Sequence, residues 1–435
     1  ADASGDVSAP NVAVNETLEI TGSCSDASKA TKAACDGTCS DASKTTEASC
    51  VVSGTCSDTS QTTSGMCLTA GFSATAITTD ADGATSVYAV DVDGDGDMDV
   101  LSASYNDDTI AWYENNGTES FTAHTISTSA DGPKSVYAVD VDGDGDMDVL
   151  SASFLDDTIA WYENDGSESF TARTISTAAD GAYSVYAVDV DGDEDMDVLS
   201  ASGNDGKIIW YENDGSESFT AHTIASVDNA RSVYAVDVDG DGDMDVLSAS
   251  VGDDKIRWYE NDGEDDPTFT ARTITNQADG AQSVYAADVD GDEDMDVLSA
   301  SVGDDKIRWY ENDGEDDPTF TARTITNQAD GAYSVYAVDV DGDGDIDVLS
   351  ASHNDDKIAW YENDGSESFT AHTISTAADK AYSVYAVDVD GDGDMDVLSA
   401  SLNDDTIAWY KNDNTWTTNT WTPDTWTASA LHLEA

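Results

Sequence analysis

Residues 135–153 read SVYAVDVDGDGDMDVLSAS, and versions of this stretch occur seven times in the 435-residue chain. Its two ends, SVYAV and DVLSAS, are rich in Val, Leu, Tyr and Ser, and they flank a segment in which Asp alternates with Gly. Branched and aromatic side chains favour β-strands, whereas Asp and Gly favour turns. The stretch therefore predicts two strands that are joined by an acidic loop.

The acidic loops recur at a regular interval. They begin at Asp91, Asp140, Asp189, Asp237, Asp288, Asp339 and Asp388, so the spacings are 49, 49, 48, 51, 51 and 49 residues. Each unit adds two further strand-like segments, at 158–164 and 170–175 in the second unit, and none shows a helical pattern. A period near 50 residues with four short strands is typical of a β-propeller. We expect an all-β protein with a seven-bladed propeller of four-stranded antiparallel blades at residues 71–413.

A Trp-Tyr pair occupies the same place in the third strand of every unit. Large aromatic side chains in one register position are how neighbouring blades pack together, although a ring of sugar-stacking platforms is the alternative. The pairs are Trp112-Tyr113, Trp161-Tyr162, Trp210-Tyr211, Trp258-Tyr259, Trp309-Tyr310, Trp360-Tyr361 and Trp409-Tyr410.

The loop itself has the composition of a calcium site. Asp91, Asp93, Asp95 and Asp99 occupy positions 1, 3, 5 and 9, and the backbone carbonyl of Asp97 at position 7 can supply a fifth ligand. Hard oxygen donors at this density suit Ca²⁺ better than Mg²⁺, which dehydrates less readily. Two carboxylates ~4–5 Å apart repel by roughly 3–4 kcal/mol at an effective dielectric of about 20, so four in one loop require a cation.

We expect about seven calcium ions, one for each blade. Position 12 is Ser in every loop and the flanks are strands, which excludes the helix-loop-helix calcium motif with its Glu at that position. The predicted ligands in the other six loops are Asp140, Asp142, Asp144, Asp146 and Asp148; Asp189, Asp191, Asp193, Asp195 and Asp197; Asp237, Asp239, Asp241, Asp243 and Asp245; Asp288, Asp290, Asp292, Asp294 and Asp296; Asp339, Asp341, Asp343, Asp345 and Asp347; and Asp388, Asp390, Asp392, Asp394 and Asp396.

The pattern D-x-D-x-D-G-x-x-D between two strands, at about one per blade, resembles the FG-GAP/VCBS repeats. These repeats form calcium-binding propellers, as in integrin α-subunits and many secreted proteins. The resemblance covers residues 71–413 and implies structural rather than catalytic calcium at the positions named above. The literal Phe-Gly and Gly-Ala-Pro landmarks are absent, so the chain is more similar to the VCBS-type variant. In the integrin-like relatives the ions stiffen one face, and ligands bind mainly on the other.

Six cysteines lie in residues 24–70, which follow an N-terminal segment at 1–23. Three similar units each begin and end in Cys with ten residues between, which predicts the disulfides Cys24–Cys35, Cys39–Cys50 and Cys56–Cys67. The alternative is a metal site, but zinc sites favour other spacings, and His is absent from this segment. Disulfides indicate an oxidising, extracellular compartment. The chain has no signal-like segment, so we expect it to start after processing or to be a fragment; Asn15 and Asn116 begin N-glycosylation sequons.

The charge limits the partners. The formal net charge is −75, from 91 acidic and 16 basic residues. Nucleic acids and anionic membranes bind through Lys and Arg, so both are excluded as partners, and cations are favoured. No apolar run reaches the roughly 18 residues of a membrane span.

The few histidines do not suggest catalysis. His124, His222 and His372 share one position in the fourth strand with Arg173, Arg272, Arg323 and Thr75, while His353 and His432 are isolated. A position that accepts His, Arg or Thr is a surface position, so we expect no enzyme. Acidic pairs between second and third strands, such as Asp107-Asp108, Asp253-Asp254 and Asp404-Asp405, are either solvated turns or sites for further cations or a calcium-bridged glycan.

Our first hypothesis is an extracellular structural protein, a scaffold for contacts with other subunits in a filament, surface layer or matrix. The alternative is a secreted adhesin or glycan-binding module, and a lyase-type enzyme comes last. Residues 72–77 match the fourth-strand pattern and are expected to close the seventh blade beside residues 406–412. Residues 426–431, in a 414–435 tail with Trp416, Trp421 and Trp426, form a surplus strand that we expect to link neighbouring molecules.

Overall fold

The computed structural model describes residues 67–68, 71–264, 266–315, 317–413 and 416–417. Residues 71–414 form one compact unit, and in a separate unit β1 (Cys67–Leu68) pairs antiparallel with β30 (Trp416–Thr417). No helix in the described part has the length and hydropathy needed to span a membrane. The predicted disulfides rest on side chains outside the described set and stay predictions, as does the surplus strand at 426–431.

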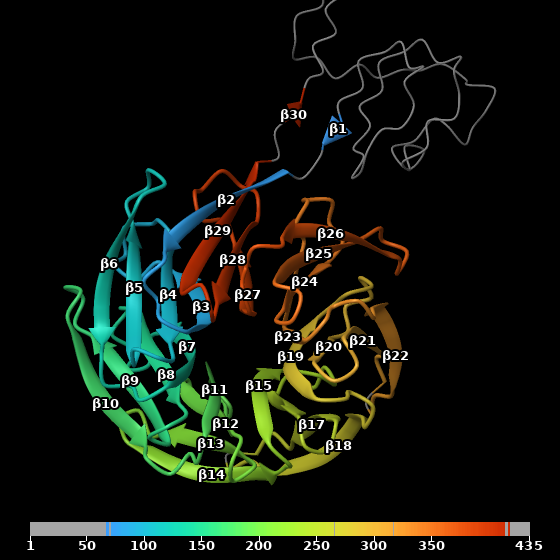
Figure 1. The fold of residues 1–435 in the computed structure, drawn as a ribbon. Helices are drawn as coiled ribbons and strands as arrows, with labels where there is room; N and C mark the ends of the chain where they lie inside the picture. The colour runs from blue at the N-terminus through green and yellow to red at the C-terminus, as the bar shows by residue number, and fades with distance from the viewer. Residues whose placement is uncertain (1–66, 69–70, 265, 316, 414–415, 418–435) are drawn as a thin grey trace, which may run out of the picture. The chain divides into compact units, whose positions relative to one another are not determined.

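The compact unit consists of seven four-stranded antiparallel sheets, which confirms the predicted propeller (Figure 1). The first blade contains β3 (Ala84–Val90), β4 (Asp99–Ser104), β5 (Thr109–Asn115) and β6 (Phe121–Ser127). The second contains β7 (Pro133–Val139), β8 (Asp148–Ser153), β9 (Thr158–Asn164) and β10 (Phe170–Ser176). The third contains β11 (Ala182–Val188), β12 (Asp197–Ser202), β13 (Lys207–Asn213) and β14 (Phe219–Ser226).

The remaining blades repeat this order. The fourth contains β15 (Ala230–Val236), β16 (Asp245–Ser250), β17 (Lys255–Asn261) and β18 (Phe269–Thr275). The fifth contains β19 (Ala281–Ala287), β20 (Asp296–Ser301), β21 (Lys306–Asn312) and β22 (Phe320–Thr326). The sixth contains β23 (Ala332–Val338), β24 (Asp347–Ser352), β25 (Lys357–Asn363) and β26 (Phe369–Ser375). The seventh contains β27 (Ala381–Val387), β28 (Asp396–Ser401), β29 (Thr406–Asp413) and, from the other end of the chain, β2 (Gly71–Thr78).

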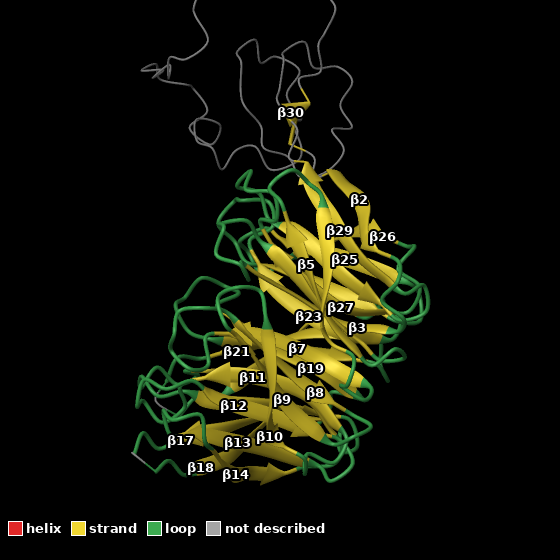
Figure 2. Cartoon of the chain, turned by 90° about the vertical axis from the view of Figure 1, so that its left-hand side faces the viewer, coloured by secondary structure: helices red, strands yellow, loops and turns green. Residues whose placement is uncertain are grey.

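The first strand of each blade lies nearest the axis of the ring. Each of these inner strands contacts the inner strand of the next blade, and β27 contacts β3, so the ring is closed (Figure 1). Loops gather at both ends of the strands, where Figure 2 shows them in green. One end carries the acidic loops, and the other carries the turns that enter the inner strands.

The seventh blade is closed by β2, as the sequence predicted. Gly71 pairs with Asp413 and Thr78 pairs with Ile407, so β2 runs antiparallel along the whole outer edge of β29. The side chains add a hydrogen bond from Ser73 Oγ to Asp413 Oδ2 at 3.1 Å. The first segment of the propeller thus completes its last blade.

Aromatic side chains pack each blade against the next. The Trp112 ring meets the Phe170 ring of the second blade edge-on, with centroids 6.5 Å apart. Phe72, from β2, makes the same contact with Trp360 at 6.4 Å, and Phe121 makes it with Trp409 at 6.1 Å. All seven tryptophans of these strands are at most 2% exposed. They are core residues, which confirms the packing interpretation and excludes a ring of exposed sugar platforms.

A second aromatic ring surrounds the axis. The Tyr of each SVYA segment contacts the equivalent Tyr on both sides, with centroids 4.8 to 4.9 Å apart and ring planes inclined by 43 to 51°. The tyrosines are Tyr88, Tyr137, Tyr186, Tyr234, Tyr285, Tyr336 and Tyr385. These tyrosines therefore contact one another all the way around the axis of the propeller.

Candidate metal centre

Each acidic loop joins the first and second strands of its blade, so all seven lie at the same end of the inner strands. In the first loop, Asp91 accepts hydrogen bonds from the backbone N–H groups of Gly94 and Gly96, at 2.8 and 3.0 Å. Asp93 accepts one from Asp95 N at 3.0 Å. These bonds turn the chain so that its alternate side chains face inward.

The side chains at positions 1, 3 and 9 converge. One carboxylate oxygen from each of Asp91, Asp93 and Asp99 lies within 4.8 Å of the others. The equivalent groups Asp140, Asp142 and Asp148; Asp189, Asp191 and Asp197; and Asp237, Asp239 and Asp245 meet the same criterion. Three hard anionic oxygens at this separation could supply part of the six to eight oxygen ligands that calcium takes.

Position 9 is the buried member of each group. Asp99 is 0% exposed, and its carboxylate accepts hydrogen bonds from Val92 N at 3.0 Å and Asn115 N at 2.7 Å. Burial nevertheless raises the pKa of Asp99 to about 6, because desolvation outweighs these two bonds. The pKa of Asp197 is raised to about 7 for the same reason. A buried carboxylate that resists ionisation beside two others is a site that a cation would stabilise.

The structure gives positions 5 and 7 other contacts. Asp95 Oδ1 accepts a hydrogen bond from Asp97 N at 2.9 Å. The carboxyl group of Asp97 lies against Gly117 in the turn between β5 and β6, where an added Cβ would be 2.5 Å from Asp97 Oδ2. The side chain of Asp97 is thus held away from positions 1, 3 and 9, and only its carbonyl stays a predicted ligand. Asp95 likewise stays a predicted ligand.

Position 6 has a left-handed backbone in all seven loops. It is Gly in five of them, as at Gly96 with φ 97°. Glu194 and Glu293 occupy this position in the third and fifth loops, with φ 74° and 77°. A side chain in this conformation is strained by about 1 kcal/mol or more, so these two loops are less relaxed than the others.

An asparagine links each loop to a neighbouring blade, a role that the sequence analysis missed. Asn164, at the end of β9, donates from Nδ2 to Val92 O in the first acidic loop at 3.2 Å and to Met147 O in its own loop at 3.2 Å. The equivalent links run from Asn115 to Val389, Asn213 to Val141, Asn261 to Val190, Asn312 to Val238, Asn363 to Val289 and Asn412 to Val340, at 2.9 to 3.2 Å. The signal was the Asn that follows every Trp-Tyr-Glu or Trp-Tyr-Lys.

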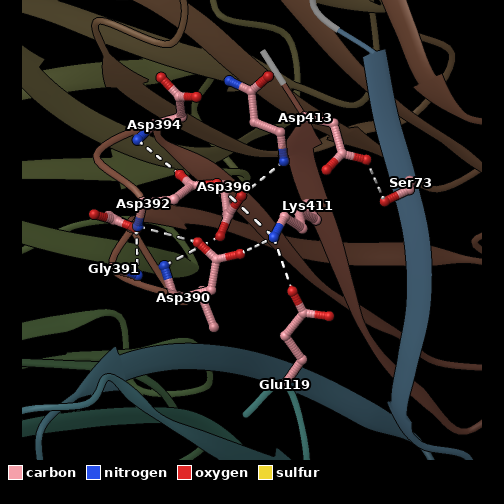
Figure 3. Close-up of polar contacts among 12 residues, drawn as sticks. Ser73, Glu119, Asp390, Gly391, Asp392, Asp394, Asp396, Lys411 and Asp413 are labelled. Atoms are coloured by element: carbon pink, nitrogen blue, oxygen red, sulfur yellow. Dashed lines mark hydrogen bonds and ion pairs between the residues drawn. The ribbon is translucent and has the colours of Figure 1, made fainter. Parts of the chain in front are cut away.

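The seventh loop contains a built-in cation (Figure 3). Lys411 stands where the other six blades have Glu, and its ammonium group contacts the carboxylate of Asp390, at position 3 of the loop. It also binds Glu119 Oε1 of the first blade at 2.8 Å and lies 3.8 Å from Asp392 Oδ2. These contacts, the bond to Asp390 first among them, raise the pKa of Lys411. The seventh site is therefore partly neutralised by the chain itself.

The outer-strand histidines have structural partners. His124 Nε2 lies 2.9 Å from Glu114 Oε2, and its ring stacks on Trp112. Arg173, at the same position in the second blade, binds Glu163 with Nε at 2.6 Å and lies over Trp161. His and Arg thus contact the equivalent Glu and Trp of their own blades, in agreement with a surface position.

The acidic pairs between second and third strands bind either a backbone N–H group of the next blade or Lys and Arg side chains of their own blade. Asp108 Oδ1 accepts a hydrogen bond from Gly132 N of the second blade at 3.0 Å. Asp253 forms ion pairs with Lys255 and Arg257. The sequon residue Asn116 is exposed in a turn, where it accepts a hydrogen bond from Thr118 N at 3.0 Å.

Comparison with known proteins agrees with this architecture. The model of the FG-GAP-like repeat family matches six overlapping segments, at residues 91–151, 140–200, 189–248, 237–299, 292–350 and 339–399. No curated protein sequence matches the chain.

Three solved structures are similar to this chain. A streptogramin B lyase is 13% identical with a TM-score of 0.54, over 78% of this chain and 97% of the lyase. BBS1N, in complex with ARL6DN, is 12% identical with a TM-score of 0.55, over 79% and 96%. An Agrocybe aegerita lectin that recognises non-reducing terminal N-acetylglucosamine is 17% identical with a TM-score of 0.49, over 73% and 86%. At these identities the lyase and BBS1N show a likeness of fold alone. Because the family model matches most of the chain, repeat by repeat, the protein belongs to the family with FG-GAP-like repeats.

Proposed function

We propose that this protein is an extracellular scaffold whose propeller is stiffened by calcium, about one ion per blade. The observation that carries the proposal is the convergence of three carboxylates in loops that asparagines link to the neighbouring blade. A divalent cation held by positions 1, 3 and 9 would neutralise the carboxylates and fix the loop. Because each fixed loop is linked to the neighbouring blade, the ions would stiffen one whole face of the ring.

Near-identity of the blades supports a scaffold. The partly exposed outer strands read Phe-Thr-Ala-His/Arg-Thr-Ile in six of the seven blades, so the rim of the ring presents closely similar surfaces from blade to blade. Such a surface suits repeated contacts with other protein subunits, copies of this chain among them, in a filament, surface layer or matrix. The cysteine units of residues 24–70 support an oxidising compartment. We assign no catalytic activity, because each of the repeated histidines is a hydrogen-bond partner of a glutamate on the neighbouring strand.

Metal removal tests the proposal. We expect excess chelator to lower the melting temperature of the full chain substantially, because calcium binds the folded state and leaves the carboxylates uncompensated when it is removed. Added Ca²⁺ should restore the melting temperature, and equimolar Mg²⁺ should restore it less. Differential scanning calorimetry measures the shift, and metal analysis of the dialysed protein gives the stoichiometry.

The control is Asp107→Asn, which removes a carboxylate from a turn outside the acidic loops and should leave the calcium response unchanged. Asp99→Asn removes the buried ligand of the first loop and should reduce the stoichiometry by about one ion. A melting curve that chelator does not move would refute structural calcium. Light scattering of the calcium-loaded chain and imaging of native material test the scaffold, and a solitary monomer in both would contradict assembly.

A further inference from the structure

A set of side chains that breaks the seven-fold repeat lies at the end of the inner strands opposite the acidic loops. Each inner strand contains a β-bulge near its start, where the register with the second strand skips one residue. The rest of the inner strand is nearly the same in every blade, but the skipped residue differs. The seven bulge residues are Thr85, Lys134, Tyr183, Arg231, Gln282, Tyr333 and Tyr382. Bulges re-aim side chains and are frequent beside binding sites.

Contacts between blades join these side chains into one group. Lys134 Nζ lies 3.7 Å from the centroid of the Tyr105 ring and 5.2 Å from that of Tyr382, although Lys134 and Tyr382 belong to blades on either side of the first. Arg231 Cζ lies 3.6 Å from the centroid of the Tyr183 ring. We call Tyr105, Lys134, Tyr183, Arg231, Tyr333, His353 and Tyr382 the axial cluster.

The other half of the cluster is aromatic. Tyr333 stacks on His353, with centroids 4.8 Å apart, and contacts Tyr382 at the same distance. All seven members of the cluster are half-buried, and Arg231 Nε is buried without a hydrogen-bond partner among the described residues. The cluster is thus a platform of aromatic rings that carries two cations near the axis.

The two cations have no anionic partner among the described residues. Every other Lys and Arg of residues 71–413 forms an ion pair with a carboxylate, except Lys380, which precedes β27 at the same end of the ring. Burial lowers the pKa of Lys134 to about 8, with a contribution from Arg231, and burial also lowers the pKa of Arg231. Desolvated cations without a counterion are costly, and aromatic faces offset only part of that cost. In a chain of net charge −75, their isolation from carboxylates indicates a place for an anion from outside.

The acidic turns at this end of the ring limit the negative charge of that anion. The turn before each inner strand carries an exposed Asp, and these aspartates surround the cluster: Asp82, Asp131, Asp180, Asp228, Asp279, Asp330 and Asp379. They repel a polyanion such as a nucleic acid, whereas one carboxylate at the axis avoids them. Guanidinium and ammonium groups bind carboxylates, and aromatic faces pack against the apolar face of a sugar ring.

We propose that the axial cluster binds a carboxylated sugar, a uronic acid at the end of a glycan. Arg231 and Lys134 hold the carboxylate, and the rings of Tyr183 and Tyr382 pack against the sugar. This site is independent of the acidic loops, from which the length of the inner strands separates it. It gives the scaffold a glycan ligand on the face that carries no predicted calcium.

The test compares two double variants in calcium buffer. Lys134→Gln with Arg231→Gln places in both bulges the residue that Gln282 already supplies in the fifth blade. The control, Arg173→His with Lys207→Thr, removes the same charge with residues found at the equivalent positions His124 and Thr109. Binding of uronic-acid-terminated oligosaccharides is measured by calorimetry, with the neutral glucose-terminated counterparts as a second probe. Circular dichroism and melting curves verify the fold.

The wild type and the control should bind the uronate probe and not the neutral probe, and the Gln variant should lose about tenfold or more in affinity. Tyr382→Gln should weaken binding without any change of charge. Failure of the wild type to bind any uronate-terminated probe overturns the proposal. So does equal binding of the neutral probe, or equal losses in the Gln variant and the control.

Discussion

At the scale of single residues, the seventh acidic loop differs from the other six because Lys411 contacts Asp390. We expect this loop to bind calcium more weakly, since its own ammonium group already neutralises position 3. Lys411→Glu places there the residue of the other six blades and should tighten calcium binding at the seventh site, so that up to one more ion is bound per chain at low free calcium. Calorimetric titration measures this change, with Lys357→Thr as a matched control at a position where Thr109 stands in the first blade. Identical titrations of the wild type and Lys411→Glu would contradict the inequality.

The strained backbone at position 6 should weaken calcium binding in two further loops, the third and the fifth. Glu194 and Glu293 hold φ 74° and 77°, where glycine is at ease. We expect a metal-free loop to relax this strain and a calcium-bound loop to retain it. Glu194→Gly with Glu293→Gly should therefore tighten calcium binding at the third and fifth sites by about 1 kcal/mol each, roughly fivefold in affinity. Competition with a chelating dye measures the change, and weaker binding in the Gly variant would show that the strain is absent.

The sequence predicted part of the site for reasons that lie within one loop. Spacing alone placed Asp91, Asp93 and Asp99 together, because a turn bonded by its own N–H groups aims alternate side chains inward. It could not assign Asn164 to Val92, because the two residues are 72 positions apart and belong to different blades. Nor could it find the axial cluster, because the strand pattern does not show where a β-bulge lies. The available signal was that the second residue of the inner strand varies while the rest of the repeat is nearly constant.

At the scale of elements, β2 completes the seventh blade. Its match to the fourth-strand pattern predicted its place beside β29, and Phe72 completes the aromatic contact with Trp360 there. Repetition made the strands and their order predictable, because each blade has the same hydrophobic pattern. The sequence could not decide the role of residues 426–431, which have a similar pattern outside the described residues.

Two deletions separate closure from assembly. Deletion of residues 414–435 should leave the propeller folded, because β2 fills the outer edge of the seventh blade, while assembly should be lost if the tail joins neighbouring molecules. Deletion of residues 1–78 removes β2 and Phe72 and should lower the melting temperature, because it exposes the edge of β29 and the Trp360 ring. Calorimetry and light scattering of the calcium-loaded proteins report the two effects. Unfolding of the seventh blade after the C-terminal deletion would refute the linking role.

At the scale of the whole molecule, the buried carboxylates couple stability to pH. The pKa values of Asp245, Asp296 and Asp347 are each raised to about 7 by desolvation, above the value of about 3.9 for an unfolded chain. Between these limits the folded, metal-free protein binds more protons than the unfolded protein, so its stability falls as pH rises. We expect the chelated protein to melt at a higher temperature at pH 5 than at pH 7.5.

Calcium should reverse this trend. The ion binds deprotonated carboxylates, so protons compete with it and its stabilising effect grows as pH rises. The increase in melting temperature on adding calcium should therefore be larger at pH 7.5 than at pH 5. Parallel melting curves with calcium and with chelator, across this pH range, measure both slopes. If the melting temperature changed with pH in the same direction in both series, the carboxyl groups with raised pKa values would not be the calcium ligands.

The pairing of Gly71 with Asp413 also governs how the ring responds to force. The chain enters β2 and leaves β29 at the same end of one antiparallel pair, so tension between these two points pulls the strands apart from that end. The hydrogen bonds then break one after another, as in peeling, and never share the load as in shear. A molecule held through both ends would lose the outer strand of its seventh blade under low force, whereas one held through one end would keep that blade complete.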